Sequence, residues 1–156
     1  MQHSESLSLH ERLEFLITLG ELQEKPELFE EVLRTLEAEG QQTAMIYGRT
    51  CLLLGRQRSA RKENEVALEL LLRARQIHEE REQNSDAVNE IDENIIDCLY
   101  ALRRYEEAGQ RAERSLQFAL SFYYRMSEEK FCRAHLNLAK CLQKLGELQR
   151  AVGCLR

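Results

Sequence analysis

Residues that interrupt helices are scarce in this sequence. Its 156 residues include one proline and seven glycines, and tryptophan is absent. No segment alternates apolar and polar residues for long enough to predict a β-sheet. Leu, Glu, Arg, Gln and Ala, which favour helices, are abundant instead. The composition therefore predicts an all-α protein.

Long apolar runs and a basic surplus are also missing. The longest uncharged stretch, residues 115–124, is far shorter than the roughly 20 residues that a membrane span needs. The N-terminus has no basic start followed by an apolar core, so it does not predict a signal peptide. The formal net charge of −5 argues against a nucleic-acid binder. We therefore expect a cytoplasmic protein with neither membrane nor nucleic acid as a partner.

The cysteines form no recognisable ligand motif. There are five of them, Cys51, Cys98, Cys132, Cys141 and Cys154. None belongs to a C-x-x-C pair, and no histidine stands at zinc-finger spacing from them. The odd number argues against a complete disulfide framework and favours small core residues in a reducing compartment. We therefore predict no metal and no cofactor.

A thiol-dependent enzyme is the main alternative in another functional class. His135 is close in sequence to Cys132 and Cys141, and a Cys–His pair is a known nucleophile arrangement. However, Cys141 shares its helix position with Cys98, which favours a packing role. No glycine-rich loop follows a strand, and no pair of carboxylates stands in an apolar setting. We therefore predict that the protein is not an enzyme and assign no catalytic residue.

A short motif recurs at the end of each apolar helical stripe. It reads TLGEL at 18–22, LLGRQ at 53–57, ALRRY at 101–105 and KLGEL at 144–148. Before the last copy, Leu138, Leu142 and Leu145 recur at helical spacing, and a second amphipathic stretch follows. We interpret the motif as the elbow of a helix-turn-helix unit, with longer turns in the first two copies. The predicted hairpins are 8–38, 41–80, 86–125 and 128–156.

Small residues near each elbow support this interpretation. Gly146 suits a helix end with positive φ, whereas Arg103 replaces glycine in the third copy, so that turn needs another shape or carries strain. Ala108 and Ala151 lie five residues after these two positions, and Ala67 occupies the same place in the second copy. A small side chain there lets two antiparallel helices approach closely. Stacked hairpins of this kind bury a continuous apolar face.

Three segments resemble the tetratricopeptide repeat (TPR), over about residues 41–156, and one of them, residues 46–55, matches the first half of the repeat. Residues 134–155 and 94–108 are similar to its pattern of Asn-Leu or its equivalent, an apolar residue, Leu-Gly, an aromatic residue or Leu, and Ala. The spacing of 41 and 43 residues between the alanines is similar to the long-helix repeats of kinesin light chains and LGN-type proteins. The resemblance implies an all-α fold, a right-handed α-α superhelix of stacked helix-turn-helix repeats, with residues 1–156 as a single domain. Because the last hairpin ends early, we expect a fragment of a longer array.

The resemblance also implies a function. In this family the first helix of each hairpin lines a concave groove, so we predict a protein-interaction scaffold or adaptor that binds a peptide or helix there. The expected groove residues are Arg49, Glu90, Glu93, Asp97, Tyr100, Arg133, Asn137, Lys140 and Lys144. Glu90, Glu93 and Asp97 share one helical face and suit a basic or mixed-charge peptide, although an ordinary solvated face has the same pattern.

Three other features leave alternatives open. The basic run from Arg56 to Lys62 fits a localisation signal, a nucleic-acid contact, a docking patch or a solvated elbow insertion. Residues 121–126 are aromatic-rich and fit either buried stacking or a partner-binding patch. The exposed C-terminal end of the stack fits a self-assembling module, for example a homodimer.

Overall fold

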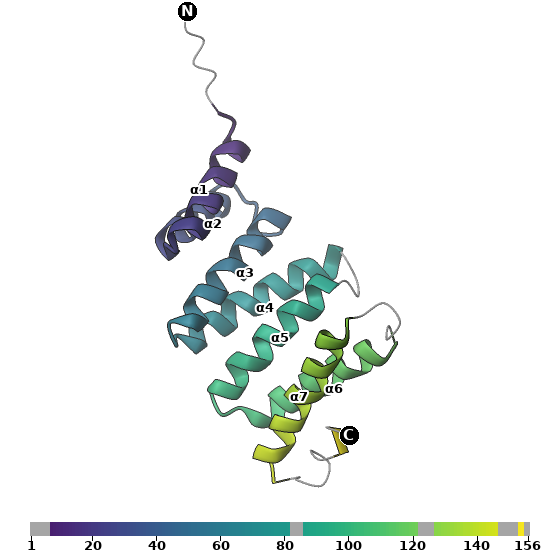
Figure 1. Cartoon of the computed structure of the whole chain (residues 1–156). Coiled ribbons are helices and arrows are strands. Elements are labelled where there is room, and N and C mark those ends of the chain that lie inside the picture. Colours follow the sequence, from purple (N-terminus) through teal and green to yellow (C-terminus); the bar gives the residue numbers. More distant parts are fainter. Residues whose placement is uncertain (1–6, 82–85, 122–126, 147–152, 155–156) are drawn as a thin grey trace, which may run out of the picture.

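The computed structural model describes residues 7–81, 86–121, 127–146 and 153–154. These ranges contain seven α-helices and no strand: α1 (Leu9–Gln23), α2 (Pro26–Ala38), α3 (Met45–Ala60), α4 (Asn64–Arg81), α5 (Asp86–Ala101), α6 (Tyr105–Ser121) and α7 (Glu128–Lys144). Figure 1 shows them following one another along a single stack, from the purple α1 to the yellow-green α7. The predicted all-α stack of helix-turn-helix units is confirmed.

Each helix packs mainly on its neighbours in the chain. α1 and α2, α3 and α4, and α5 and α6 form three hairpins, and α7 packs against α6. Beyond consecutive helices, α3 also contacts α5, and α5 also contacts α7. The apolar core is therefore continuous along the stack, because each hairpin buries its faces against the hairpins before and after it.

Local signals fix where the helices begin. Ser8 caps α1 in a capping box: its Oγ accepts from the Glu11 backbone N–H at 3.3 Å, and Glu11 Oε2 accepts from the Ser8 N–H at 2.8 Å. Pro26 occupies the first turn of α2, where its missing N–H costs no hydrogen bond. Ser127 caps α7 by accepting from the Lys130 N–H at 3.4 Å.

A residue with positive φ follows each first helix within two positions. These elbow residues are Glu24 (φ 51°), Lys62 (65°), Arg103 (61°) and Gly146 (80°). At the first three elbows the next residue donates its N–H to the carbonyl five positions earlier, for example Arg104 to Leu99 at 2.9 Å, which is the Schellman arrangement. The prediction for Gly146 is confirmed. Arg103 adopts the same left-handed conformation, so the third elbow carries the strain that a glycine avoids.

The recurring Leu-Gly motif marks the elbow only in the last two copies. In the first copy Gly20 lies inside α1, and in the second Gly55 lies inside α3. The predicted long turns are therefore wrong, because residues 24–25 and 61–63 suffice. Here glycine serves close packing: a Cβ on Gly20 would lie 3.0 Å from the Phe29 ring, and one on Gly55 would lie 3.0 Å from Leu71 Cγ.

Replacing Arg103 with glycine should stabilise the protein. A non-glycine residue in the left-handed region costs about 1–2 kcal/mol, and part of that gain is lost because glycine is more disordered when unfolded. We expect Arg103→Gly to raise the free energy of unfolding by about 0.5–1 kcal/mol in urea titration. Ala101→Gly, two residues earlier in α5, should lower it by a similar amount. A loss of stability in Arg103→Gly would contradict the elbow assignment.

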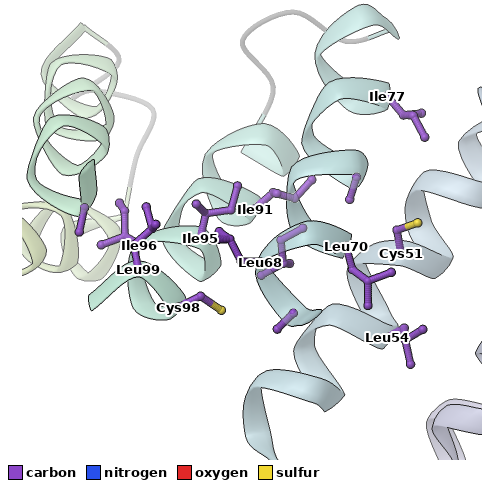
Figure 2. Close-up of a cluster of buried hydrophobic side chains, with 14 of the residues drawn as sticks. Cys51, Leu54, Leu68, Leu70, Ile77, Ile91, Ile95, Ile96, Cys98 and Leu99 are labelled. Carbon is purple, nitrogen blue, oxygen red and sulfur yellow. The ribbon is translucent and has the colours of Figure 1, made fainter. Parts of the chain in front are cut away.

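Apolar side chains on two faces of α4 join the second and third hairpins. Figure 2 shows Leu70 and Ile77 directed toward α3, where Cys51 and Leu54 lie, and Leu68 directed toward α5. Ala67 and Ala108, each five residues after an elbow, are fully buried, as expected for close helix contact. The third predicted alanine, at position 151, lies outside the described residues. In the first hairpin Phe29 occupies the equivalent position, opposite Gly20.

Candidate functional site

Arginine–glutamate pairs join consecutive first helices on one face of the stack. They are Glu14 (α1) with Arg49 (α3), Arg56 (α3) with Glu90 (α5), and Glu93 (α5) with Arg133 (α7). In the last pair, Arg133 Nη1 lies 3.4 Å from Glu93 Oε2. One such pair therefore spans every junction between described first helices.

The register of these pairs follows from the elbows. Arg49, Glu90 and Arg133 each lie thirteen residues before an elbow residue, so they occupy the same position in successive hairpins. Their charge alternates in sign along the stack, and each meets an opposite charge from the preceding first helix. Exposed pairs of this kind contribute about 0–1 kcal/mol each. These charges are thus already engaged within the protein.

A cleft of about 510 Å³ opens between α5 and α7, with Arg56 of α3 at its edge. We call it the α5/α7 cleft. Six of the nine predicted groove residues line it: Glu90, Glu93, Asp97, Arg133, Asn137 and Lys140. Its other lining residues are Arg56, Asn94 and Leu136. Three carboxylates and three cations therefore face one another around two amides.

Asn137 and Glu93 are the two buried polar residues that line this cleft, and Asn137 is the uncharged one. It is 8% exposed, and its side-chain amide makes no hydrogen bond within the described ranges. The neighbouring Asn94 donates from Nδ2 to the Glu90 carbonyl at 2.8 Å. The atoms of its amide are not among the fully covered unpartnered atoms, so they reach the cleft. Asn137 therefore offers two donors and an acceptor to whatever enters it.

The acidic side chains of the cleft are partly desolvated. Burial raises the pKa of the Glu93 carboxyl, and Arg133 opposes that effect. Desolvation by the cleft walls also raises the pKa of Asp97, although the residue as a whole is exposed, and here Lys140 and Arg133 oppose it. Keeping Glu93 and Asp97 ionised therefore lowers the stability of the folded protein.

Neutralising Asp97 should stabilise the protein in a pH-dependent way. Because the folded-state pKa of Asp97 is raised, the folded protein binds the proton more tightly than the unfolded chain does. The resulting penalty is absent below the unfolded pKa and fully present above the folded pKa. We therefore expect Asp97→Asn to raise the free energy of unfolding at pH 7 but not at pH 3, as measured by urea titration. An equal effect at both pH values would contradict this assignment.

The remaining predicted residues lie around the cleft or outside it. Lys140 Nζ lies 5.8 Å from the centre of the Tyr100 ring, which itself meets Tyr105 edge-on at 5.2 Å. Lys144 is exposed in the last turn of α7. Arg49 lies on α3, two hairpins before α7, and pairs with Glu14. Tyr100, Lys144 and Arg49 therefore do not line the α5/α7 cleft.

A second cleft, of about 410 Å³, lies between the end of α1 and the second half of α3. We call it the α1/α3 cleft. It is lined by Glu21, Glu24, Phe29, Leu53, Arg56, Gln57, Ala60 and Arg61. Arg56 lines both clefts, so they adjoin along the face that carries the ion pairs.

The basic run is not a solvated elbow insertion. Its first five residues belong to α3, and only Arg61 and Lys62 lie in the turn. Arg56 pairs with Glu90, while Arg58 pairs with Glu30 and, at 2.7 Å, with Glu63. These arginines hold neighbouring helices together, and Arg56 also joins the two clefts. Arg56 and Asn94 were not among the groove residues predicted from the sequence. Their distances from the elbow residues, which the sequence did not reveal, would have identified them.

The buried cysteines are packing residues. Cys51, Cys98 and Cys141 are fully buried, and burial raises the pKa of each thiol, that of Cys51 to about 12. Cys132 is exposed and Cys154 is partly buried. Within the described ranges, no three His, Cys, Asp or Glu side chains gather as a metal site. None of the described helices is long and apolar enough to cross a membrane. Most of the aromatic segment, residues 122–126, lies outside the described residues.

Comparison with solved structures places the fold. The chain superposes on BtubC (BKLC) from P. vanneervenii with a TM-score of 0.86 at 16% identity, covering 99% of this chain and 64% of that one. It superposes on a Podosopora anserina kinesin-light-chain-type protein with nearly identical TPR-like repeats with a TM-score of 0.77 at 19% identity, covering 97% and 76%. A single-substitution variant of the latter gives 0.72 at 20% identity, covering 94% and 69%.

These similarities and the helix pairs define a TPR-like helical-repeat fold, which confirms the resemblance to kinesin light chain repeats. The chain spans about two thirds of the length of BtubC. No family model matches the sequence, and no curated protein matches it significantly.

Proposed function

We propose that the protein is an interaction scaffold that binds a peptide or helix of a partner protein along the face formed by α3, α5 and α7. The observation that carries the proposal is the α5/α7 cleft, which is lined by the Asn137 amide, a group with no hydrogen-bond partner within the described ranges. A peptide backbone offers both a donor and an acceptor at each residue, so it can satisfy this amide. The mixed charges around it favour a partner of mixed charge.

The ion pairs within the protein limit which side chains of the cleft are free to contact a ligand. Glu90, Glu93 and Arg133 already have protein partners, so a ligand must displace those contacts to use them. Asp97 and Lys140 have no ion pair within the described ranges and line the same cleft. We therefore assign recognition mainly to Asn137, Asp97 and Lys140, with Leu136, 46% exposed, as an apolar contact.

Binding can be tested without knowing the natural partner. Peptides selected from a random phage-displayed library against the immobilised protein would be synthesised, and their dissociation constants measured by fluorescence anisotropy. Loss of a central buried contact typically costs 2 kcal/mol or more, so we expect Asn137→Ala and Asp97→Lys to weaken binding by about tenfold or more.

A matched charge reversal on a second helix provides the control. Glu69 is exposed on α4, outside both clefts, so Glu69→Lys should leave the dissociation constant unchanged. Circular dichroism would establish that each variant is folded. Equal affinity for all variants, or an equal loss in Glu69→Lys, would refute binding in the cleft.

We further propose that the protein acts in the cytoplasm and is not an enzyme. The three buried thiols with raised pKa values are protonated at neutral pH, which supports a packing role rather than nucleophilic attack. A homodimer through the C-terminal end stays a prediction, because residues 147–152 and 155–156 lie outside the described ranges.

A further inference from the structure

Two carboxylates of the α1/α3 cleft are left unpaired, although two arginines line the same cleft. Glu21 and Glu24 line it, and within the described ranges neither carboxylate has an ion-pair or hydrogen-bond partner. Both lie at the carbonyl end of α1, which has no basic residue in its last turn. The partial negative charge of that helix end therefore adds to the two carboxylates.

Gln57 adds a polar group in an unusual place. It lies five residues before the elbow, the position that Cys98 and Cys141 occupy in the later hairpins as fully buried packing residues. Gln57 Nε2 donates to the Gly20 carbonyl at 3.3 Å, whereas its Oε1 is covered and accepts no hydrogen bond. An acceptor without a donor at the cleft wall makes the site more negative.

The two arginines of the cleft are directed elsewhere. Arg56 pairs with Glu90 on α5, and Arg61 Nη2 donates to the backbone carbonyl of Glu24 at 3.4 Å. Neither arginine forms an ion pair with Glu21 or Glu24 within the described ranges. The half-buried Leu53 and the exposed Ala60 supply an apolar wall beside them.

We propose that the α1/α3 cleft accepts a lysine or arginine side chain of the partner. The methylene groups of that side chain lie against Leu53 and Ala60, and its charged head faces Glu21 and Glu24. This inference rests on the proposed function, since a partner bound along the same face supplies the basic residue. The pocket adjoins the α5/α7 cleft at Arg56, so one extended segment can reach both.

A small probe tests the pocket independently of any partner. The isotope-labelled chain would be titrated with N-acetylarginine amide and with its uncharged counterpart N-acetylnorleucine amide, and backbone amide shifts followed by NMR. We expect the arginine probe to shift Gly20, Gln57 and Ala60 saturably, and the norleucine probe to leave them unchanged. In Glu21→Gln/Glu24→Gln the dissociation constant of the arginine probe should rise by about tenfold, because its charged partners are gone.

The matched control is Glu31→Gln/Glu69→Gln, which removes two exposed carboxylates outside both clefts. It should leave the affinity of the arginine probe unchanged. Shifts spread over all acidic surfaces, equal affinity in the two double variants, or equal binding of the norleucine probe would overturn the basic-side-chain pocket. Those results would not bear on peptide binding at Asn137. Conversely, if the Asn137 and Asp97 variants did not weaken peptide binding, the proposed function would be wrong, and binding of the arginine probe to the α1/α3 cleft would be unaffected.

Discussion

Exchanging the sizes of Gly20 and Phe29 should cost less than half of the stability that the two single changes cost together. Phe29 is fully buried and its ring fills the space above Gly20. In the third hairpin the equivalent positions, four before and five after the elbow, hold Leu99 and Ala108. In the first hairpin the large side chain at this contact comes from the second helix. In the third hairpin it comes from the first helix.

The single variants should each be costly. Phe29→Ala leaves a cavity and is expected to lower the free energy of unfolding by about 3–5 kcal/mol. Gly20→Leu forces side-chain atoms into the Phe29 ring and is expected to cost about 1–3 kcal/mol. In Gly20→Leu/Phe29→Ala the new leucine occupies the vacated space, so the total loss measured in urea should be less than half of the sum.

A second double variant serves as the control. It distinguishes coupling between Gly20 and Phe29 from a general tolerance of the core to substitution. Leu36 is buried further along α2, and the three atoms nearest to a Cβ on Gly20 all belong to Phe29. Gly20→Leu combined with Leu36→Ala should therefore lose the sum of the two single effects. Additive losses in both pairs would show that Gly20 and Phe29 do not share one packing site.

Removing the Asp92 carboxylate should be the most damaging single change to the polar part of the structure. Asp92 on α5 accepts from Arg75 Nε of α4 at 2.7 Å and from Arg111 Nη1 of α6 at 3.1 Å, with 17% of its side chain exposed. Burial lowers the pKa of Arg111, and Asp92 opposes this effect. Without the carboxylate, two partly buried guanidinium groups lose their shared partner.

We expect Asp92→Ala to lower the free energy of unfolding by about 2–4 kcal/mol, somewhat less than for a fully buried pair. Glu79→Ala removes the exposed partner of Arg75 and should cost about 0–1 kcal/mol. The triple variant Asp92→Leu/Arg75→Met/Arg111→Leu replaces all three charges and should recover to within about 1 kcal/mol of the natural protein. An Asp92→Ala variant as stable as Glu79→Ala would contradict the role of this cluster.

The sequence predicted the all-α fold correctly because apolar spacing reports burial directly. The stripe that contains Leu138 and Leu142 identifies the buried side of α7. Residues such as Asn137 and Lys140 then fall on the opposite or flanking faces. The groove residues came from the resemblance to the TPR rather than from this spacing. Six of them line one cleft, and their role in binding stays a prediction.

The elbows were harder to predict because glycine has two uses in this fold. Gly146 permits positive φ, whereas Gly20 permits close contact with Phe29. The sequence motif is the same in both places, and the true first elbow is Glu24, a residue with no turn preference. The inter-hairpin pairs depend on that register: Arg56 and Glu90 are 34 residues apart, and only the elbow positions bring them together.

The most direct test of the account is to map a bound peptide on the protein. A library-selected peptide would be added to the isotope-labelled chain, and backbone and side-chain amide shifts followed by NMR. Binding along the first helices predicts the largest shifts at Asn94, Asn137 and Lys140, with little change on α4 and α6. Shifts concentrated on α4 and α6 would show that the partner binds the opposite face and that the proposed groove is not the functional site.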